Sequence, residues 1–444
     1  MMDMIGVDIL IIGGGAQGLW LLNDLTKRNY RAVLLERREL GGGQTCHSHG
    51  LIHRGHYYDD IDMMIILNAA AQFWKAFVVE KGLGRADTSR ALAGFGAGAA
   101  VQRHKYFWNA AGLNFSPCAR DDFPAMLQGG KVCHLFQTDE FSVDTSEVVA
   151  ELAHDVDHAI YKLDECKGSL EFEMDGASVV RVTALLSGCE VTFKPSFVVF
   201  SAGVGNYSLL AKLGADNNVV PAGTPVQAQR KNHMMVLRGP TLPLITAVFP
   251  IRGGLDGVFL CSRRDPDSRE PVWLISDHNS TPFPMSNEEE SSIGPEPSEE
   301  WVQRMMVSLR ATAPQLLTDR SAQDVQVAVY TGLTSERNFG IGSHMTDLFI
   351  DPLGFENLLT VWPTKLTMTP FASNVVLRFI RPKVPEPSGK WPIVDRDVKL
   401  PGPKIAREMW RRAKVDGPHE CKTDWSPYLE FIDRWHVSPR WDPP

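Results

Sequence analysis

The hydrophobic pattern changes its period twice near the start of the chain. Residues 7–12 form a run of strand length that is apolar apart from Asp8, and a glycine-rich turn follows it. A helical stretch then extends to about residue 28, and residues 31–36 form a second strand-like run. This order predicts a strand, a helix and a strand in one βαβ unit, which is the context in which dinucleotides bind.

The central part of the chain predicts a helix and then many strands. Residues 60–82 are helical in pattern, whereas residues 94–111 are rich in glycine and alanine and are interpreted as a loop. A turn entering a helix is expected over residues 139–154. Strand-like runs follow at residues 169–174, 179–186, 190–200, 233–237, 244–249 and 272–275. Turns of Gly, Pro and Arg-Asp separate the later runs, which favours an antiparallel sheet.

Later in the chain, Ser298 is expected to cap a helix whose first turn carries acidic residues. Two strands and a helix follow it, at residues 325–330, 358–362 and 369–380. The tail beyond residue 381 is rich in Pro, Lys and Trp, with helical patterns only at residues 405–414 and 428–435. Large aromatic residues are rare in disordered linkers, so the tail is expected to pack on the body or on a partner subunit.

Composition narrows the classes of function. The formal net charge of −8 provides no basic field for nucleic acid or for an anionic membrane. No uncharged apolar run approaches the length of a membrane helix, and the N-terminus lacks the features of a secretory signal. Seven scattered cysteines without a CxxC pair fit reduced thiols. We therefore expect a cytoplasmic protein without a membrane span, and structural zinc is not expected.

The glycine-rich turn indicates the cofactor class. Gly13 permits a tight turn, Gly15 lets the backbone approach a pyrophosphate, and Gly18 allows close helix packing. Glu36 ends the second strand at the position where an acid binds a ribose hydroxyl, which disfavours a 2′-phosphate. These residues leave FAD and NAD as the alternatives.

The segment after Glu36 resembles FAD-dependent oxidoreductases of the D-amino-acid oxidase and glycerol-3-phosphate dehydrogenase superfamily. The run Leu51-Ile52-His53-x-Gly55-x-x-Tyr58 is similar to glycerol-3-phosphate and L-2-hydroxyglutarate dehydrogenases, in which the matching segment borders the flavin. Residues 197–203, ending in Ala202-Gly203, and the run Lys365-Leu366-Thr367 match two later segments. The resemblance implies FAD contacts from Gly13, Gly15, Gly18, Glu36, Arg37, Gly43, Gln44, Thr45, His47, Ser48, Gly50, Leu51, Ala202, Gly203, Lys365, Leu366 and Thr367.

The resemblance spans about residues 7–382 and implies an α/β fold, α+β overall. We expect a Rossmann-like FAD-binding domain with an antiparallel-sheet substrate domain. The FAD-binding domain is assigned to residues 1–82, 139–225 and 325–382, the substrate domain to 83–138 and 226–324, and an extension to 383–444. Where relatives carry Gly-Leu-Arg, this chain has Gly332-Leu333-Thr334, with Arg337 three residues later. This departure weakens the expectation of an acidic substrate.

His53 is the leading catalytic candidate, because an alcohol that loses hydride must also lose a proton, and imidazole accepts one near neutral pH. A neutral histidine with a structural hydrogen bond is the equal alternative. Lys365 is placed to stabilise reduced flavin, and Arg337 is a third catalytic candidate. Substrate contacts are expected from His53, His56, Tyr58 and Arg252. Tyr58, Arg252 and Arg337 are equally plausible as packed or solvated residues, and a surface lysine is the alternative for Lys365.

His47 lies where dimethylglycine and sarcosine dehydrogenases carry a covalently flavinylated histidine, but a plain cofactor contact with noncovalent FAD is favoured. The histidines at positions 47, 49, 53 and 56 suggest a metal only weakly, since no acidic ligands accompany them locally. The segment already has a flavin role. No metal is therefore expected.

The predicted reaction is transfer of hydride from a CH–OH group of a small hydroxy acid or polyol to flavin N5. Oxidation of a CH–NH donor is the first alternative, and a non-catalytic or RNA-modifying flavoprotein is the second. No second strand-GxGxxG-helix unit is found, so no nicotinamide site is expected. The substrate would reduce the flavin, and oxygen, a quinone or a carrier protein would reoxidise it.

Overall fold

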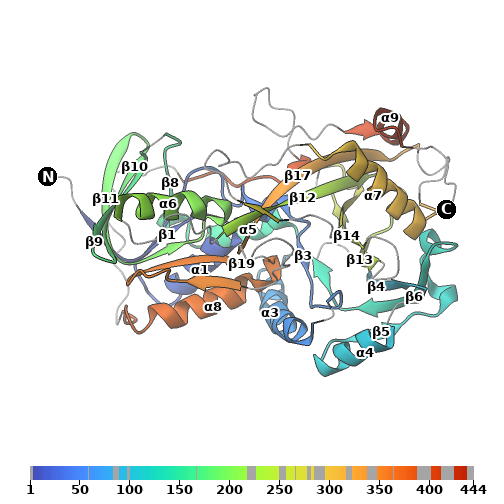
Figure 1. Cartoon of the computed structure of the whole chain (residues 1–444), viewed down its shortest axis with the longest axis horizontal. Coiled ribbons are helices and arrows are strands. Elements are labelled where there is room, and N and C mark those ends of the chain that lie inside the picture. The colour runs from blue at the N-terminus through green and yellow to red at the C-terminus, as the bar shows by residue number, and fades with distance from the viewer. Residues whose placement is uncertain are drawn as a thin grey trace.

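Two large β-sheets organise the chain (Figure 1). The computed structural model describes residues 4–58, 60–83, 90–97, 101–166, 168–217, 227–249, 257–265, 267–277, 282–284, 296–316, 323–337, 348–363, 365–387, 402–411 and 425–437. The mixed helices and sheets confirm the predicted α/β class.

Within the described residues, the first sheet has eight strands in the order β18-β19-β11-β1-β2-β8, and β10 and β9 continue it from β11. They are β1 (Ile5–Ile12), β2 (Ala32–Glu36), β8 (Ile160–Lys162), β9 (Leu170–Asp175), β10 (Ser178–Leu186), β11 (Cys189–Phe200), β18 (Leu348–Asp351) and β19 (Leu358–Pro363). β1 pairs in parallel with both β2 and β11. A central parallel strand is covered on both faces, which explains its apolar run without alternation.

Helices and strands cover the two faces of the first sheet. Ile9 and Ile11 pack in a core with α1 (Ala16–Thr26), α5 (Thr145–His154) and α8 (Thr369–Ile380). Leu10 and Ile12 point into a second core with β9, β10 and α6 (Asn206–Asn217). The carboxyl end of β1 and the N-terminus of α1 are therefore held rigidly where the glycine-rich turn joins them.

The second sheet is largely antiparallel. Its described strands run in the order β20-β17-β12-β15-β14-β13-β4-β6-β5, with β16 beside β12. They are β4 (Arg90–Gly96), β5 (Phe115–Pro117), β6 (Val132–Thr138), β12 (Gln227–Arg238), β13 (Ile245–Phe249), β14 (Val258–Arg264), β15 (Pro271–Asp277), β16 (Pro282–Pro284), β17 (Gln326–Arg337) and β20 (Ser426–Pro427). α7 (Glu299–Thr312) packs on one face through Trp301 and Met305. Its N-cap is Ser298, as predicted.

Short elements connect the sheets. A two-stranded ladder joins β3 (Leu51–Ile52) to β7 (Phe141–Ser142). The remaining described helices are α2 (Gln44–His47), α3 (Ile61–Glu80), α4 (Val101–Ala110) and α9 (Tyr428–Arg434). α9 packs in the core of the second sheet, so this part of the tail is folded onto the body as expected.

Three sequence interpretations differ from the structure. Residues 94–111, interpreted as a loop, contribute to β4 and contain α4. Gly94 lies in β4, next to β13. A Cβ added there would lie 2.4 Å from the Phe249 side chain on β13, so close packing explains the glycine. The helix predicted at residues 405–414 is wrong for its described part, in which only the 3₁₀ turn Met409–Arg411 forms. β17, grouped by its sequence with the FAD-binding segments, pairs along its whole length with β12 in the second sheet.

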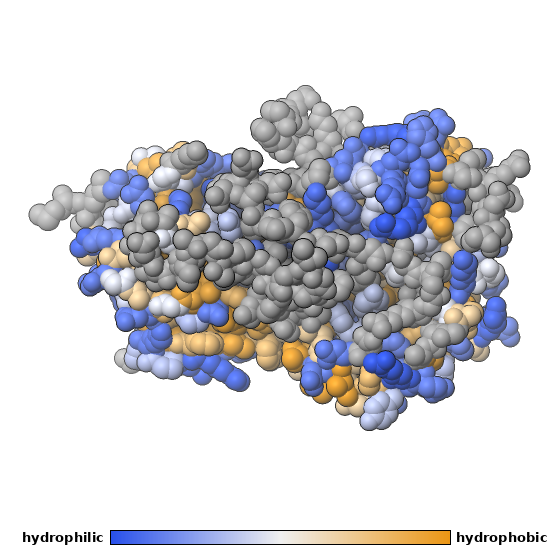
Figure 2. Space-filling view, in the orientation of Figure 1, coloured by the Kyte–Doolittle hydropathy of each residue, from blue (hydrophilic) through white to orange (hydrophobic). Residues whose placement is uncertain are grey.

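α3 is the described helix that is long and apolar enough to cross a membrane, by length and composition alone. The sequence pattern did not single it out. Its buried face behaves as a core helix, because Trp74 Nε1 donates to the carbonyl of Thr367 at 3.1 Å. Hydrophobic surface gathers along the lower edge of the molecule over α3 and α8 (Figure 2), where Phe73 and Phe379 are exposed.

Candidate functional site

Gly13 and Gly18, which flank the turn into α1, pack without room for a side chain. Gly13 has φ of +114°, and a Cβ added there would lie 2.6 Å from the backbone of Ala202, at the end of β11. A Cβ on Gly18 would lie 2.0 Å from the carbonyl oxygen of Gly13. The turn therefore lies tightly between β1, α1 and β11, and Gly15 provides the N-cap of α1 without a capping side chain. A helix N-terminus in this position attracts an anion such as pyrophosphate.

Glu36 closes this end of the site. Its carboxylate accepts from the backbone N–H of Gly14 at 2.6 Å and of Arg38 at 2.7 Å. Burial raises the pKa of Glu36, while these backbone donors oppose the shift. Its side chain thus shapes the turn as well as facing the space where a ribose would lie.

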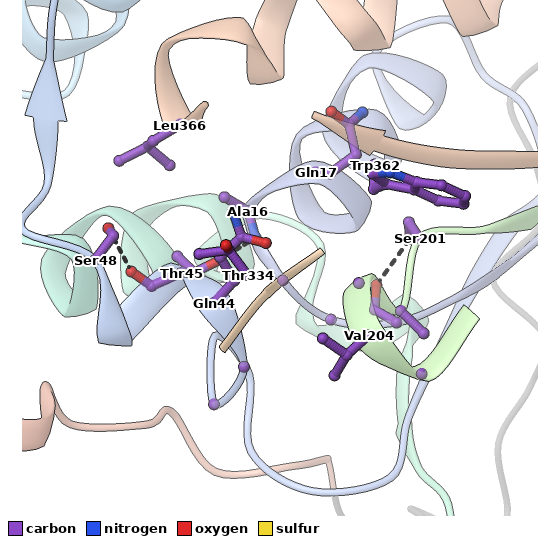
Figure 3. Close-up of a pocket in the computed structure, with 18 of the residues that line it drawn as sticks. Ala16, Gln17, Gln44, Thr45, Ser48, Ser201, Val204, Thr334, Trp362 and Leu366 are labelled. Atoms are coloured by element: carbon purple, nitrogen blue, oxygen red, sulfur yellow. Dashed lines mark hydrogen bonds between the residues drawn. The ribbon is translucent and has the colours of Figure 1, made fainter. Parts of the chain in front are cut away.

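A cavity of about 590 Å³ begins at this turn and continues toward the second sheet. Its walls come from both sheets and from the segment after β2 (Figure 3). The predicted cofactor and site residues that line it are Gly13, Gly15, Glu36, Arg37, Gly43, Gln44, Thr45, Ser48, Leu51, His53, Tyr58, Ala202, Gly203, Lys365 and Leu366. The fold thus brings together most of the residues that the sequence placed at the flavin.

The segment around α2 is anchored to both sides of the cavity. The Oγ1 of Thr45 accepts from the backbone N–H of Ala16 at 3.0 Å, which ties α2 to the start of α1. Gln44 Oε1 accepts from the N–H of Ser335 on β17 at 3.2 Å. Ser48 Oγ donates to the Thr45 carbonyl at 2.9 Å (Figure 3). These contacts fix the position of the segment between the start of α1 and β17.

The far end of the cavity carries His53, Tyr58 and Lys365. The His53 ring stacks on Tyr58 at 5.5 Å, and the Lys365 ammonium lies 5.8 Å from the centre of the Tyr58 ring. Burial lowers the pKa of His53 to about 4; nearby Glu140 opposes this shift, whereas Lys365 adds to it. His53 Nδ1 has no hydrogen-bond partner in the described part of the chain. The buried imidazole is therefore neutral at physiological pH.

Sequence reasoning missed two residues near His53. His49 lines the cavity, and its Nε2 lies 3.1 Å from the hydroxyl of Ser276 on β15; burial lowers its pKa to about 3. Glu140 is buried between the N–H of Arg54 and the ring of His56, and these hydrogen bonds and charges hold its pKa at about 2. Its only sequence signal was its place before the strand that pairs with residues 51–52.

Several predicted site residues do not line the cavity. His56 is fully buried behind it, with Nε2 on the Asn114 carbonyl and its ring edge against Trp108, so it does not reach a substrate there. The carbonyl of Thr367 is taken by Trp74. Gly18 and Gly50 are not among the residues that line the cavity. Arg252 lies outside the described residues, and of Arg337 only the backbone, at the end of β17, is described.

His47 lies behind the cavity wall and is buried against β17. The hydroxyl of Tyr330 donates to its carbonyl at 3.1 Å. A Cβ on Gly332 would lie 2.9 Å from the His47 Cβ, so this glycine lets β17 pass close to α2. Gly332 therefore has a packing role in this chain, whereas Thr334 of the same run lines the cavity.

The βαβ turn, with a cavity that begins at it and is walled by both sheets, has the features of a dinucleotide-binding protein. Residues 8–360 match the family model described as FAD dependent oxidoreductase (DAO), and the chain belongs to this family. The protein is thus an FAD-dependent oxidoreductase. The cavity fits the dinucleotide that the family uses, because glycine backbone and the N-terminus of α1 line one end of it.

The chain is 25% identical over 431 residues to the probable FAD-dependent oxidoreductase PA4991 of Pseudomonas aeruginosa, a match that covers 93% of this chain and 100% of that protein. The crystal structure of that protein has a TM-score of 0.66 at 22% identity, covering 92% and 99% of the two chains. Glycine oxidase from Geobacillus kaustophilus has a TM-score of 0.62 at 15% identity, covering 85% and 95%. These likenesses of structure establish the fold.

A further relative matches only a short part of the chain. One of the subunits of the anaerobic glycerol-3-phosphate dehydrogenase of Haemophilus influenzae is 40% identical over 57 residues, which is 13% of this chain and 10% of that protein. Because the match is short, it supports a shared local segment and leaves the substrate class undetermined.

Proposed function

We propose that the cavity binds FAD noncovalently and that the enzyme removes hydride from the CH–OH group of a small hydroxy acid or polyol. The observation that carries this proposal is the buried, neutral His53 beside Lys365 at the end of the cavity remote from the glycine-rich turn. A neutral imidazole in this position is ready to accept the hydroxyl proton of an alcohol.

The residues of the turn are proposed to hold the cofactor. The N-terminus of α1, with Gly13 and Gly15, would take the pyrophosphate, and Glu36 would face the adenosine ribose. Gln44, Thr45, Ser48, Leu366 and the backbone after Lys365 would line the middle of the dinucleotide. Bound FAD supplies the hydride acceptor.

Proton and hydride leave the donor to different places. His53 accepts the hydroxyl proton of the donor through a ring nitrogen. The donor carbon that carries this hydroxyl loses hydride, so that a carbonyl forms. Lys365 offers a fixed positive charge at the same end of the cavity, where it stabilises negative charge that develops during the reaction. Tyr58 keeps the His53 ring in its stacked orientation.

The position of His47 supports noncovalent binding. Its side chain is packed against β17 behind the wall and does not line the cavity. Acid precipitation of the purified protein should release free FAD into the supernatant. Yellow colour that remained with the pellet would establish a covalent link and contradict this part of the proposal.

Oxidation of a CH–NH donor is the competing reaction. A neutral amine gives up hydride without a separate base, so His53 would then be dispensable. The test is anaerobic mixing of the enzyme with hydroxy acids, polyols and amines, with flavin absorbance as the signal. Bleaching by a hydroxyl donor, lost in His53→Gln, is expected; bleaching only by amines would exclude the CH–OH reaction. Oxygen, a quinone or a carrier protein is the proposed oxidant, and each can be supplied separately.

A further inference from the structure

Residues 402–411, here named the C-terminal strap, lie against the segment that follows β2. The N–H of Leu40 donates to the carbonyl of Lys404 at 2.8 Å, and the N–H of Ala406 donates to the carbonyl of Leu40 at 2.9 Å. The thiol of Cys46 lies 3.5 Å from the carbonyl oxygen of Ala406. The strap therefore pairs with one end of the cofactor segment as a short parallel bridge.

A buried charge ties the strap to the other end of the same segment. Glu408 is fully buried, and its Oε1 lies 2.6 Å from Nη1 of Arg263 and accepts from the hydroxyl of Thr145 at 2.9 Å. Arg263 is itself buried and donates to the carbonyl of His49 at 3.3 Å. The strap carboxylate thus balances the guanidinium that holds the His49 backbone in place.

The strap also contacts the second sheet. Trp410 is buried in a cluster with Met234, Tyr330 and other side chains of β12, β15 and β17. The next residue, Arg411, forms an ion pair with Asp144 at the N-cap of α5. The strap is therefore anchored both at α5 and on the second sheet. Its removal would break the ion pairs of Glu408 and Arg411 and expose the apolar cluster around Trp410.

Between the two anchor points lies the segment that supplies Gly43, Gln44, Thr45 and Ser48 to the cavity. No described residue of the strap lines the cavity itself. We propose that the docked strap positions residues 40–49 for FAD, so that docking of the strap and binding of FAD strengthen each other. Glu408 is the central positioning residue. This inference rests on the FAD site proposed above.

Coupling between two sites is reciprocal, so FAD must also stabilise the docked strap. Hydrogen exchange measured on the apoprotein before and after addition of FAD tests this in the unmodified chain. Exchange in residues 402–411 is expected to slow on FAD binding, together with residues 40–49. Residues 428–434 in α9, which belong to the same tail but pack on the second sheet, are the internal control. Unchanged exchange of the strap would overturn the proposal.

A pair of neighbouring variants gives the second test. Glu408→Gln keeps the shape of the side chain and removes its charge, whereas Arg407→Ala changes an exposed neighbour. Titration of each apoprotein with FAD should give a dissociation constant raised roughly tenfold for Glu408→Gln, since a buried pair is broken. Arg407→Ala should bind as the unmodified protein does. Equal affinities in all three would sink the positioning role.

Absence of FAD binding and absence of coupling to the strap would give different results. If the unmodified protein binds no FAD, the proposed function fails. If FAD binds tightly whatever the state of Glu408 and leaves strap exchange unchanged, only the coupling fails. Should Glu408→Gln not fold, the exchange experiment on the unmodified chain still decides the question.

Discussion

At the scale of single residues, the site depends on how burial sets the charge of its titratable groups. His53 and His49 lie in the same wall, and burial lowers the pKa of both below the physiological range. Glu140 shows the opposite outcome, because hydrogen bonds and nearby histidines outweigh its burial. A neutral base at His53 and a cation at Lys365 therefore line one part of the cavity, and the buried anion Glu140 lies behind this wall near His53.

The pH profile of kcat/KM with a hydroxyl donor should report His53. The neutral imidazole is the active form, so activity should rise with pH, reach half its maximum near the pKa of about 4 and stay level toward neutrality. His53→Gln should remove this rise and lower the rate of flavin reduction roughly 100-fold or more. A profile that still rose near pH 4 in His53→Gln would show that another group titrates.

Glu140→Gln should shift that profile to lower pH, because the Glu140 charge raises the His53 pKa. Comparison of kcat/KM profiles for the variant and the unmodified enzyme measures this shift. A purely structural role of Glu140 would lower the stability of the fold but leave the midpoint of the profile in place.

The lowered pKa of Glu140 also predicts that the fold loses stability in acid. Its folded pKa of about 2 lies below its usual value of 4.5, so its contribution is complete above pH 4.5 and is lost as pH falls toward 2. The difference corresponds to about 3 kcal/mol. Urea unfolding between pH 5 and about 2 should therefore show a steeper loss of stability in the unmodified protein than in Glu140→Gln. Parallel curves would contradict the assignment.

At the scale of elements, some helices and strands were predictable from the local sequence pattern, and others depend on contacts with residues remote in the chain. The strand, turn and helix that open the chain were predictable because their residues are contiguous and their periods differ. β4 was not predictable in this way, because the place of Gly94 in it depends on packing against Phe249 of β13, which is remote in sequence. The helix expected at residues 405–414 failed for a similar reason, since contacts with Leu40 and Arg263 hold the strap extended.

The turn before α1 gives a sharp test of element packing. Gly18→Ala places a Cβ 2.0 Å from the Gly13 carbonyl oxygen, so α1 must move away from the turn. The purified variant should contain little FAD, as measured by its absorbance near the flavin band. Gly6→Ala in β1 is the matched control, because its added Cβ meets no atom within 4 Å. A fully flavinated Gly18→Ala would refute the close-packing account.

At the scale of the whole molecule, the cavity is walled by both sheets, so a bound cofactor joins them. A ligand that binds only the folded state stabilises it by about 2.7 kcal/mol at a concentration one hundred times its dissociation constant. Thermal unfolding of apoprotein titrated with FAD should shift to higher temperature as a whole. A shift confined to one of two separate transitions would show that the sheets unfold independently.

The sequence by itself determined the cofactor class and the family-like segments, because glycines, an acid and a histidine run lie at short, fixed spacings. Only the tertiary structure decided which of those residues face the cavity. In the folded chain, His56 bonds to the Asn114 carbonyl outside the cavity, and His47 packs against β17. Glu140 lies near His53, and Glu408 pairs with Arg263. The physical reason is that burial and ion pairing depend on neighbours that lie from about fifty to several hundred residues apart in the chain, and no local pattern records them.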